Sequence, residues 1–78
     1  QVDRSKIFFG ATVTIADDED QHRTITIVGD DEADAARGQV GWNAPITRAL
    51  RGAAIGDVRR LTLPAGAIDY EVLAISYP

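Results

Sequence analysis

A chain of 78 residues, 45% of them hydrophobic, is long enough for one folded domain with a small core and too apolar for a disordered tail. It contains no cysteine, which excludes a disulfide scaffold, and no apolar run approaches the roughly 20 residues that cross a bilayer. Its net charge of −4 disfavours non-specific binding to nucleic acid, because phosphate contacts need clustered lysine and arginine.

The charges are distributed unevenly along the chain. Residues 1–36 carry three basic and nine acidic side chains, a balance of −6, whereas residues 37–78 carry five basic and three acidic ones, a balance of +2. Two interpretations are open. The polarity orients the domain on a charged partner, or the acidic segments only keep a small domain soluble.

Two strands are predicted in the first half, at residues 12–15 and 24–27, where polar and apolar residues alternate and β-branched side chains are frequent. The polar residues 17–22 between them predict a hairpin loop. A second acidic segment, residues 29–38, has no apolar side chain larger than alanine and is predicted to be a second loop. We expect both acidic segments to be more mobile than the strands.

A short strand at residues 39–42 is predicted next, followed by a helix at about residues 45–51. Pro45 suits the first helical position, where its missing N–H would have no partner. One apolar stripe follows on the helix, formed by Ile46, Ala49 and Leu50. Glycine after the stripe predicts the end of the helix.

Residues 58–63 and 68–77 predict a closing hairpin around a Pro-Ala-Gly-Ala turn. The last strand breaks simple alternation, which indicates either a bulge near Leu73 and Ala74 or a central strand covered on both faces. Together the elements predict a single α+β domain, with a mainly antiparallel twisted sheet and one short helix.

The segment 40–57 carries a pattern that identifies a family. It has a turn formed by Val40, Gly41, Asn43, Ala44 and Pro45, then the helical residues Thr47-Arg48-Ala49-Leu50, then Gly56-Asp57. This resembles the C-terminal domain of the bacterial Gre transcript-cleavage factors, GreA and GreB, with its Ile-Ser-x-Asp-Ser-Pro turn, Ala-Arg-Ala-Leu helix and Gly-Asp turn.

The resemblance covers essentially the whole chain. FFGATVTI at residues 8–15 and IVGDDEAD at residues 27–34 look more like GreB than GreA, and residues 63–77 look like the closing hairpin of the family. It implies an FKBP-like domain at residues 1–78, with the sheet curling around the helix and the N-terminal coiled coil of Gre factors absent. Because the chain starts at Gln1 and has no methionine, we expect a fragment of a longer protein.

In Gre factors the turn and the helix start belong to the surface that docks on RNA polymerase. The resemblance therefore implies a partner-binding surface in which two arginines add charge from the exposed helix face, made up of Gly41, Trp42, Asn43, Ala44, Pro45, Arg48 and Arg51. The chain departs from the family pattern here, since Gly41 and Ala44 stand in place of serines and Asn43 in place of aspartate. Ala44 lacks the hydroxyl that caps a helix, and Asn43 is the alternative cap. Drift in a structural turn and altered docking both remain open.

Other kinds of site have less support. The acidic runs 17–20 and 30–34 contain the carboxylates that Mg²⁺ and Ca²⁺ prefer, but the first lacks the glycine and glutamate of an EF-hand. His22 lies in a hairpin loop with no nucleophile motif around it. An FKBP-type prolyl isomerase would line a pocket with aromatic side chains, but the core and its rim account more simply for Phe8, Phe9, Trp42, Tyr70 and Tyr77. We expect no catalytic residue, metal or cofactor.

By resemblance, the domain is a non-enzymatic module that grips the rim of the secondary channel of bacterial RNA polymerase in the cytoplasm, without specific nucleic-acid binding or a membrane. The coiled coil of a Gre factor then promotes cleavage of backtracked RNA. The alternatives are a Rnk-like regulator, which binds polymerase without stimulating cleavage, and a prolyl isomerase.

Overall fold

The described residues, 4–78, form one five-stranded sheet in the computed structural model. In chain order the strands are β1 (Thr12–Ala16), β2 (His22–Val28), β3 (Gln39–Gly41), β4 (Val58–Leu63) and β5 (Gly66–Ser76). They lie in the order β3-β2-β1-β5-β4, and every neighbouring pair is antiparallel except β2 and β3. The predicted mainly antiparallel sheet is confirmed, and the parallel pair is an addition that the sequence did not predict.

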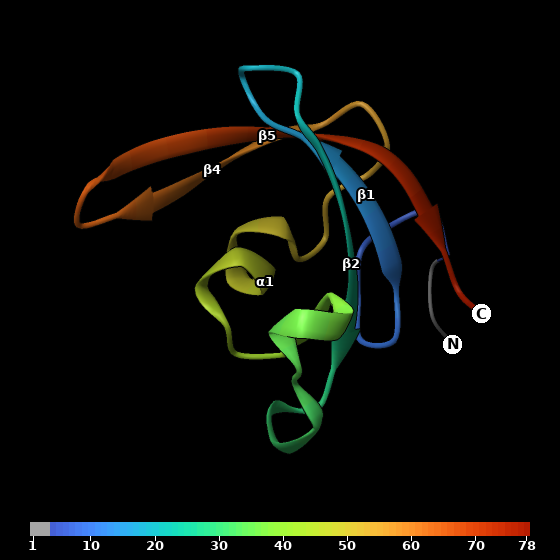
Figure 1. The fold of residues 1–78 in the computed structure, drawn as a ribbon. Helices are drawn as coiled ribbons and strands as arrows, with labels where there is room; N and C mark the ends of the chain where they lie inside the picture. Colours follow the sequence, from blue (N-terminus) through green and yellow to red (C-terminus); the bar gives the residue numbers. More distant parts are fainter. Residues whose placement is uncertain (1–3) are drawn as a thin grey trace.

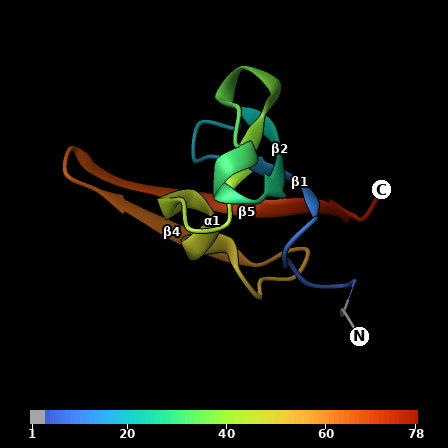
Figure 2. The same ribbon diagram turned by 90° about the horizontal axis from the view of Figure 1, so that it is seen from below.

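The sheet curls around one short helix, α1 (Pro45–Leu50), which lies on its concave side (Figures 1 and 2). The predicted apolar stripe faces the sheet, because Ile46 and Leu50 are buried and Ala49 packs against the core. Alternate residues of β1 and β2 supply the opposite side of the core, which contains Val13, Ile15, Ile25 and Ile27. The predicted arrangement of a curled sheet around one helix is therefore confirmed.

A bulge in β5 explains the broken alternation of the last strand. Thr14 of β1 pairs with Ala74 and the next residue, Ile15, pairs with Val72, so Leu73 is an extra residue on β5. One extra residue reverses the direction of all side chains that follow it. Ile75 consequently packs on the same core as Val72, although the two positions are three apart. Of the two explanations that the sequence left open, the bulge near Leu73 and Ala74 is the one that the strand register shows.

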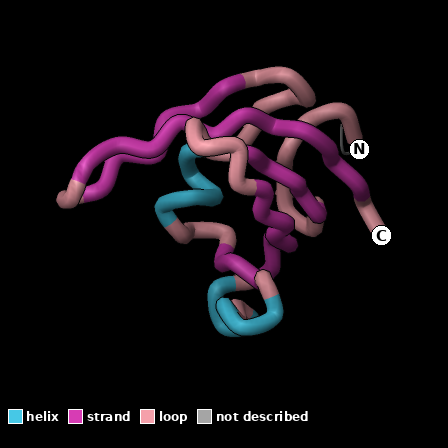
Figure 3. Tube along the Cα trace, turned by 45° about the horizontal axis from the view of Figure 1, so that its top comes forward, coloured by secondary structure: helices cyan, strands magenta, loops and turns pink. Residues whose placement is uncertain are grey.

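The acidic connection between β2 and β3 is a loop, as predicted, but it is more ordered than its composition indicates. It contains two 3₁₀ turns, η1 (Asp30–Glu32) and η2 (Ala35–Arg37), which Figure 3 shows near the short strand β3. Asp34 caps η2 by accepting a hydrogen bond from the backbone N–H of Ala36 at 3.1 Å. Gly38 closes the turn with a φ of 71°, which a residue without Cβ adopts at no steric cost.

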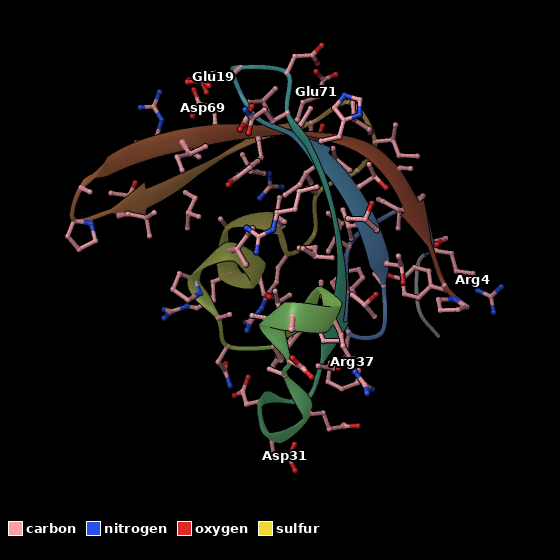
Figure 4. All side chains as sticks on the ribbon, viewed as in Figure 1. Arg4, Glu19, Asp31, Arg37, Asp69 and Glu71 are labelled. Atoms are coloured by element: carbon pink, nitrogen blue, oxygen red, sulfur yellow. The ribbon has the colours of Figure 1, made fainter. Side chains whose placement is uncertain are left out.

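The other acidic segment is the predicted hairpin between β1 and β2. Its first residue, Asp17, accepts hydrogen bonds from the backbone N–H groups of Glu19 and Gln21, each at 2.9 Å. Figure 4 places Glu19 and Asp31 at opposite ends of the domain, so the acidic first half of the chain does not form a single acidic face. His22 is exposed, as expected.

The predicted boundaries of β1, β2 and β5 shift by one or two residues, and those beside the turn before α1 and at its end shift by one. β3 ends at Gly41 rather than at Trp42, and α1 ends at Leu50, since Arg51 has left helical geometry with a ψ of 132°. After the helix, Gly52 and Ala53 exchange backbone hydrogen bonds with Ile7, which ties the start of the described chain to the core. Residues 4–78 contain no helix with the length and apolar content needed to span a membrane.

Candidate docking surface

The turn between β3 and α1, residues 41–45, is called the docking turn below. The backbone N–H of Ala44 donates to the carbonyl of Gly41 at 3.1 Å, which closes the turn. The same carbonyl accepts a 2.7 Å hydrogen bond from the hydroxyl of Thr47, a fully buried side chain on α1. Because one carbonyl receives both bonds, the turn and the first turn of the helix form a single hydrogen-bonded unit.

Ala44 occupies the N-cap of α1, with φ −62° and ψ 148°, and provides no side-chain hydrogen bond. Extended geometry is also what a residue before proline prefers. The proposed alternative cap, Asn43, does not cap the helix, because its side chain is engaged by Asp30. The helix therefore begins with an alanine where a hydroxyl would satisfy an otherwise unpaired N–H.

Ala44→Ser is expected to raise the free energy of unfolding by roughly 0.5–2 kcal/mol, the usual value of an N-cap hydroxyl. Chemical denaturation of the domain measures the change. Ala65→Ser, in the exposed turn between β4 and β5, is the matched control and should leave the midpoint within error. An unchanged midpoint for Ala44→Ser would mean that the new hydroxyl does not reach the first turn of α1.

Asp30, in η1, binds the docking turn through Asn43. One carboxylate oxygen accepts from the backbone N–H of Asn43 at 3.0 Å, and the other accepts from its side-chain amide at 2.7 Å. The hydrogen bond from the backbone of Asn43, followed by the one from its side chain, lowers the pKa of Asp30. Burial opposes them, and the positive charge of Arg51 makes the smallest contribution, which again lowers the pKa. The carboxylate is therefore ionised at neutral pH and makes charge-assisted hydrogen bonds.

Gly41 gives Asp30 the space that it needs. A Cβ at position 41 would lie 2.4 Å from the Oδ1 atom of Asp30 and 3.3 Å from its Cα. Any larger residue at this position would therefore force the carboxylate of Asp30 to shift from its contact with Asn43.

Arg51 does not extend outward from the helix face, and that expectation was wrong. Its guanidinium lies 3.9 Å from the centre of the Trp42 ring, in cation–π geometry, and donates to the carbonyl of Trp42. It also donates to the side-chain oxygen of Asn43 at 3.3 Å, whereas its Nε is buried without a hydrogen-bond partner among residues 4–78. Arg51 thus supports the docking turn from within.

Trp42 joins the turn to the N-terminal part of the domain. Its ring meets that of Phe9 edge to face, with centroids 5.9 Å apart, and Phe9 is 54% exposed. The side chain of Arg48, two residues before the end of α1, is exposed and makes no ion pair or hydrogen bond within residues 4–78. The structure therefore brings Trp42, Asn43 and Arg51 together, while Arg48 is the arginine that faces solvent.

Sequence reasoning missed Asp30 and Phe9 as parts of this surface. Asp30 was grouped with an acidic run, and nothing in the run distinguishes it from Asp31. The glycine at position 41 was the available signal, because a glycine in place of a larger residue often marks a close approach. For Phe9 the sequence carries no signal, since its contact depends on how the chain folds back.

Residues 2–77 match the family model described as "Transcription elongation factor, GreA/GreB, C-term". The chain belongs to the GreA/GreB family. GreA of Hyphomonas neptunium is 50% identical to it over 74 residues, which are 94% of this chain and 47% of that protein. GreA of Agrobacterium fabrum is 47% identical over the same shares. This GreA/GreB domain therefore spans about half the length of the curated relatives it matches.

Solved structures support the fold of this GreA/GreB domain. GreA factor homolog 1 of Thermus thermophilus superposes with a TM-score of 0.78 at 27% identity, over 91% of this chain and 48% of that one. A GreA/GreB factor from Nitrosomonas europaea also gives a TM-score of 0.78, over 97% of this chain and 64% of that one, but at 20% identity it supports only the fold. The curated relatives named above are GreA proteins, so the closer likeness to GreB stays a prediction.

Proposed function

We propose that this GreA/GreB domain docks on bacterial RNA polymerase at the rim of its secondary channel, through the docking turn and the exposed face of α1. One observation supports this above the others: exposed groups sit on a turn that is already fixed. Asn43, Pro45 and Arg48 are exposed. The backbone that carries them donates a hydrogen bond to the carboxylate of Asp30 and accepts one from the hydroxyl of Thr47. A pre-formed surface loses less conformational entropy on binding than a mobile loop does.

We also propose that the domain is not an enzyme and acts in the cytoplasm, where the polymerase works. The aromatic side chains considered for an isomerase pocket are dispersed: Tyr70 is buried in the core, Tyr77 donates to the carbonyl of Lys6, and Phe9 packs on Trp42. Residues 4–78 contain no group of three metal-binding side chains.

When this domain is docked on the polymerase, it raises the local effective concentration of any other segment of the same protein. GreB-like stimulation of transcript cleavage would come from a coiled coil upstream of residue 1, and a Rnk-like protein would carry only a short helical stub there. The upstream sequence of the gene separates these two proposals. About 70–80 residues of heptad-patterned helix with acids at the tip favour the cleavage factor.

The isolated domain is expected to bind RNA polymerase weakly and to leave RNA cleavage at the intrinsic rate of the polymerase. Weak binding follows from the small contact area that a domain of this size offers. Pull-down with bacterial RNA polymerase and a cleavage assay on a backtracked complex measure the two properties, with a full-length GreA protein as the positive control. Absence of binding would contradict docking, and cleavage above the intrinsic rate would contradict a role in docking alone.

A further inference from the structure

We propose that Asp30 is a positioning residue for the docking turn, and that it acts on the partner-binding surface through Asn43. This inference rests on the docking function proposed above and adds a residue from a separate element, η1, to it. One residue of the acidic segment after β2, Asp30, then has a specific function, whereas the rest of the segment is a solvated connection.

The carboxylate of Asp30 holds both the backbone and the side chain of Asn43. The two carboxylate oxygens of Asp30 receive the backbone N–H and the side-chain amide of the same residue, at 3.0 and 2.7 Å. Removing the carboxylate would therefore free the peptide plane of the turn together with the side chain. Hydrogen bonds to an ionised group are also stronger than neutral ones.

The side chain of Asn43 is held in one orientation by opposite charges. Its Nδ2 donates to Asp30, and its Oδ1 accepts from the guanidinium of Arg51 at 3.3 Å. An amide suits this place because one end donates and the other accepts. An aspartate at position 43 would instead bring a second carboxylate against that of Asp30, and like charges at this distance repel.

Gly41 completes the arrangement, because the Oδ1 atom of Asp30 occupies the volume that a Cβ would need. Asp31, the next residue of η1, is the natural comparison. It carries the same side chain and is exposed, but makes no hydrogen bond to the docking turn, and in Figure 4 it points away from the domain. The two neighbouring acids thus differ in position and not in chemistry.

The experiment compares Asp30→Ala with Asp31→Ala in polymerase binding, at a temperature at which both variants are folded. We expect Asp30→Ala to weaken binding about tenfold and Asp31→Ala less than about twofold, since both remove one negative charge and only the first frees Asn43. Amide exchange at Asn43 in the free domain should accelerate in Asp30→Ala alone. Equal binding by the two variants would overturn the inference.

A reciprocal exchange tests the action through Asn43. Asn43→Asp is expected to weaken binding about tenfold by repulsion, and the double variant Asp30→Asn with Asn43→Asp should return to within about threefold of wild type, because an amide and a carboxylate again face each other. Failure of the double variant to recover would overturn the inference. If the wild-type domain does not bind polymerase at all, docking is wrong, and amide exchange at Asn43 still decides whether Asp30 positions the turn.

Discussion

Arg48→Glu is expected to lower the affinity of the domain for RNA polymerase by about tenfold or more, because the charge at the centre of the exposed helix face is reversed. Arg48 is suited to contact a partner, since it faces solvent and pairs with no acid among residues 4–78. The loss should become smaller as the salt concentration rises, because exposed charges are screened within about 8 Å at physiological ionic strength. Binding measured at two salt concentrations gives both results.

Arg23→Glu is the matched control for this charge reversal. Arg23 is an exposed arginine on β2, also without an ion pair in the described part of the chain, and its reversal changes the net charge by the same amount. It should leave binding nearly unchanged, as should neutralising Asp18 in the β1–β2 loop. A loss that is equal for Arg48→Glu and Arg23→Glu would mean that total charge, and not the helix face, controls binding.

The sheet and the helix were predictable because their signals are local. Alternation of β-branched residues marks β1 and β2, and the proline and apolar stripe mark α1. The β5 bulge was also visible, since Val72 and Ile75 are apolar at a spacing that no regular strand buries on one side. The two 3₁₀ turns were missed because an acidic run with no apolar side chain larger than alanine has the composition of a loop. The hydrogen bond by which Asp34 caps η2 has no separate signal in that composition.

The residues of the candidate site were predicted better than their roles. Position in the motif was enough to choose Trp42, Asn43 and Arg51, but their contacts depend on groups distant in sequence. Asp30 reaches Asn43 because the connection between the parallel strands β2 and β3 places η1 against β3, beside the docking turn. Arg51 turns inward because the chain leaves the helix at that residue and the Trp42 ring offers a face for the guanidinium.

Leu50→Ala is expected to lower the free energy of unfolding by about 2–5 kcal/mol, the range for removing a buried leucine side chain. Leu50 is 1% exposed and packs α1 against the concave side of the sheet. A domain of this size has a total stability of roughly 4–12 kcal/mol, so the loss would be a large share of it. Thermal or chemical denaturation measures the change. Alanine is a good helix former, so the effect will not come from helix propensity.

Leu63→Ala makes the same chemical change at a position that is 37% exposed, at the end of β4, and should lower the free energy of unfolding by less than half as much.

The comparison of the two variants also separates the effect on stability from the effect on docking. Thr47 on α1 holds the carbonyl of Gly41, so a helix loosened from the sheet releases the docking turn. Leu50→Ala should therefore weaken polymerase binding even below its unfolding midpoint, whereas Leu63→Ala should not. Equal destabilisation by both variants would show that α1 is not seated on the sheet through Leu50.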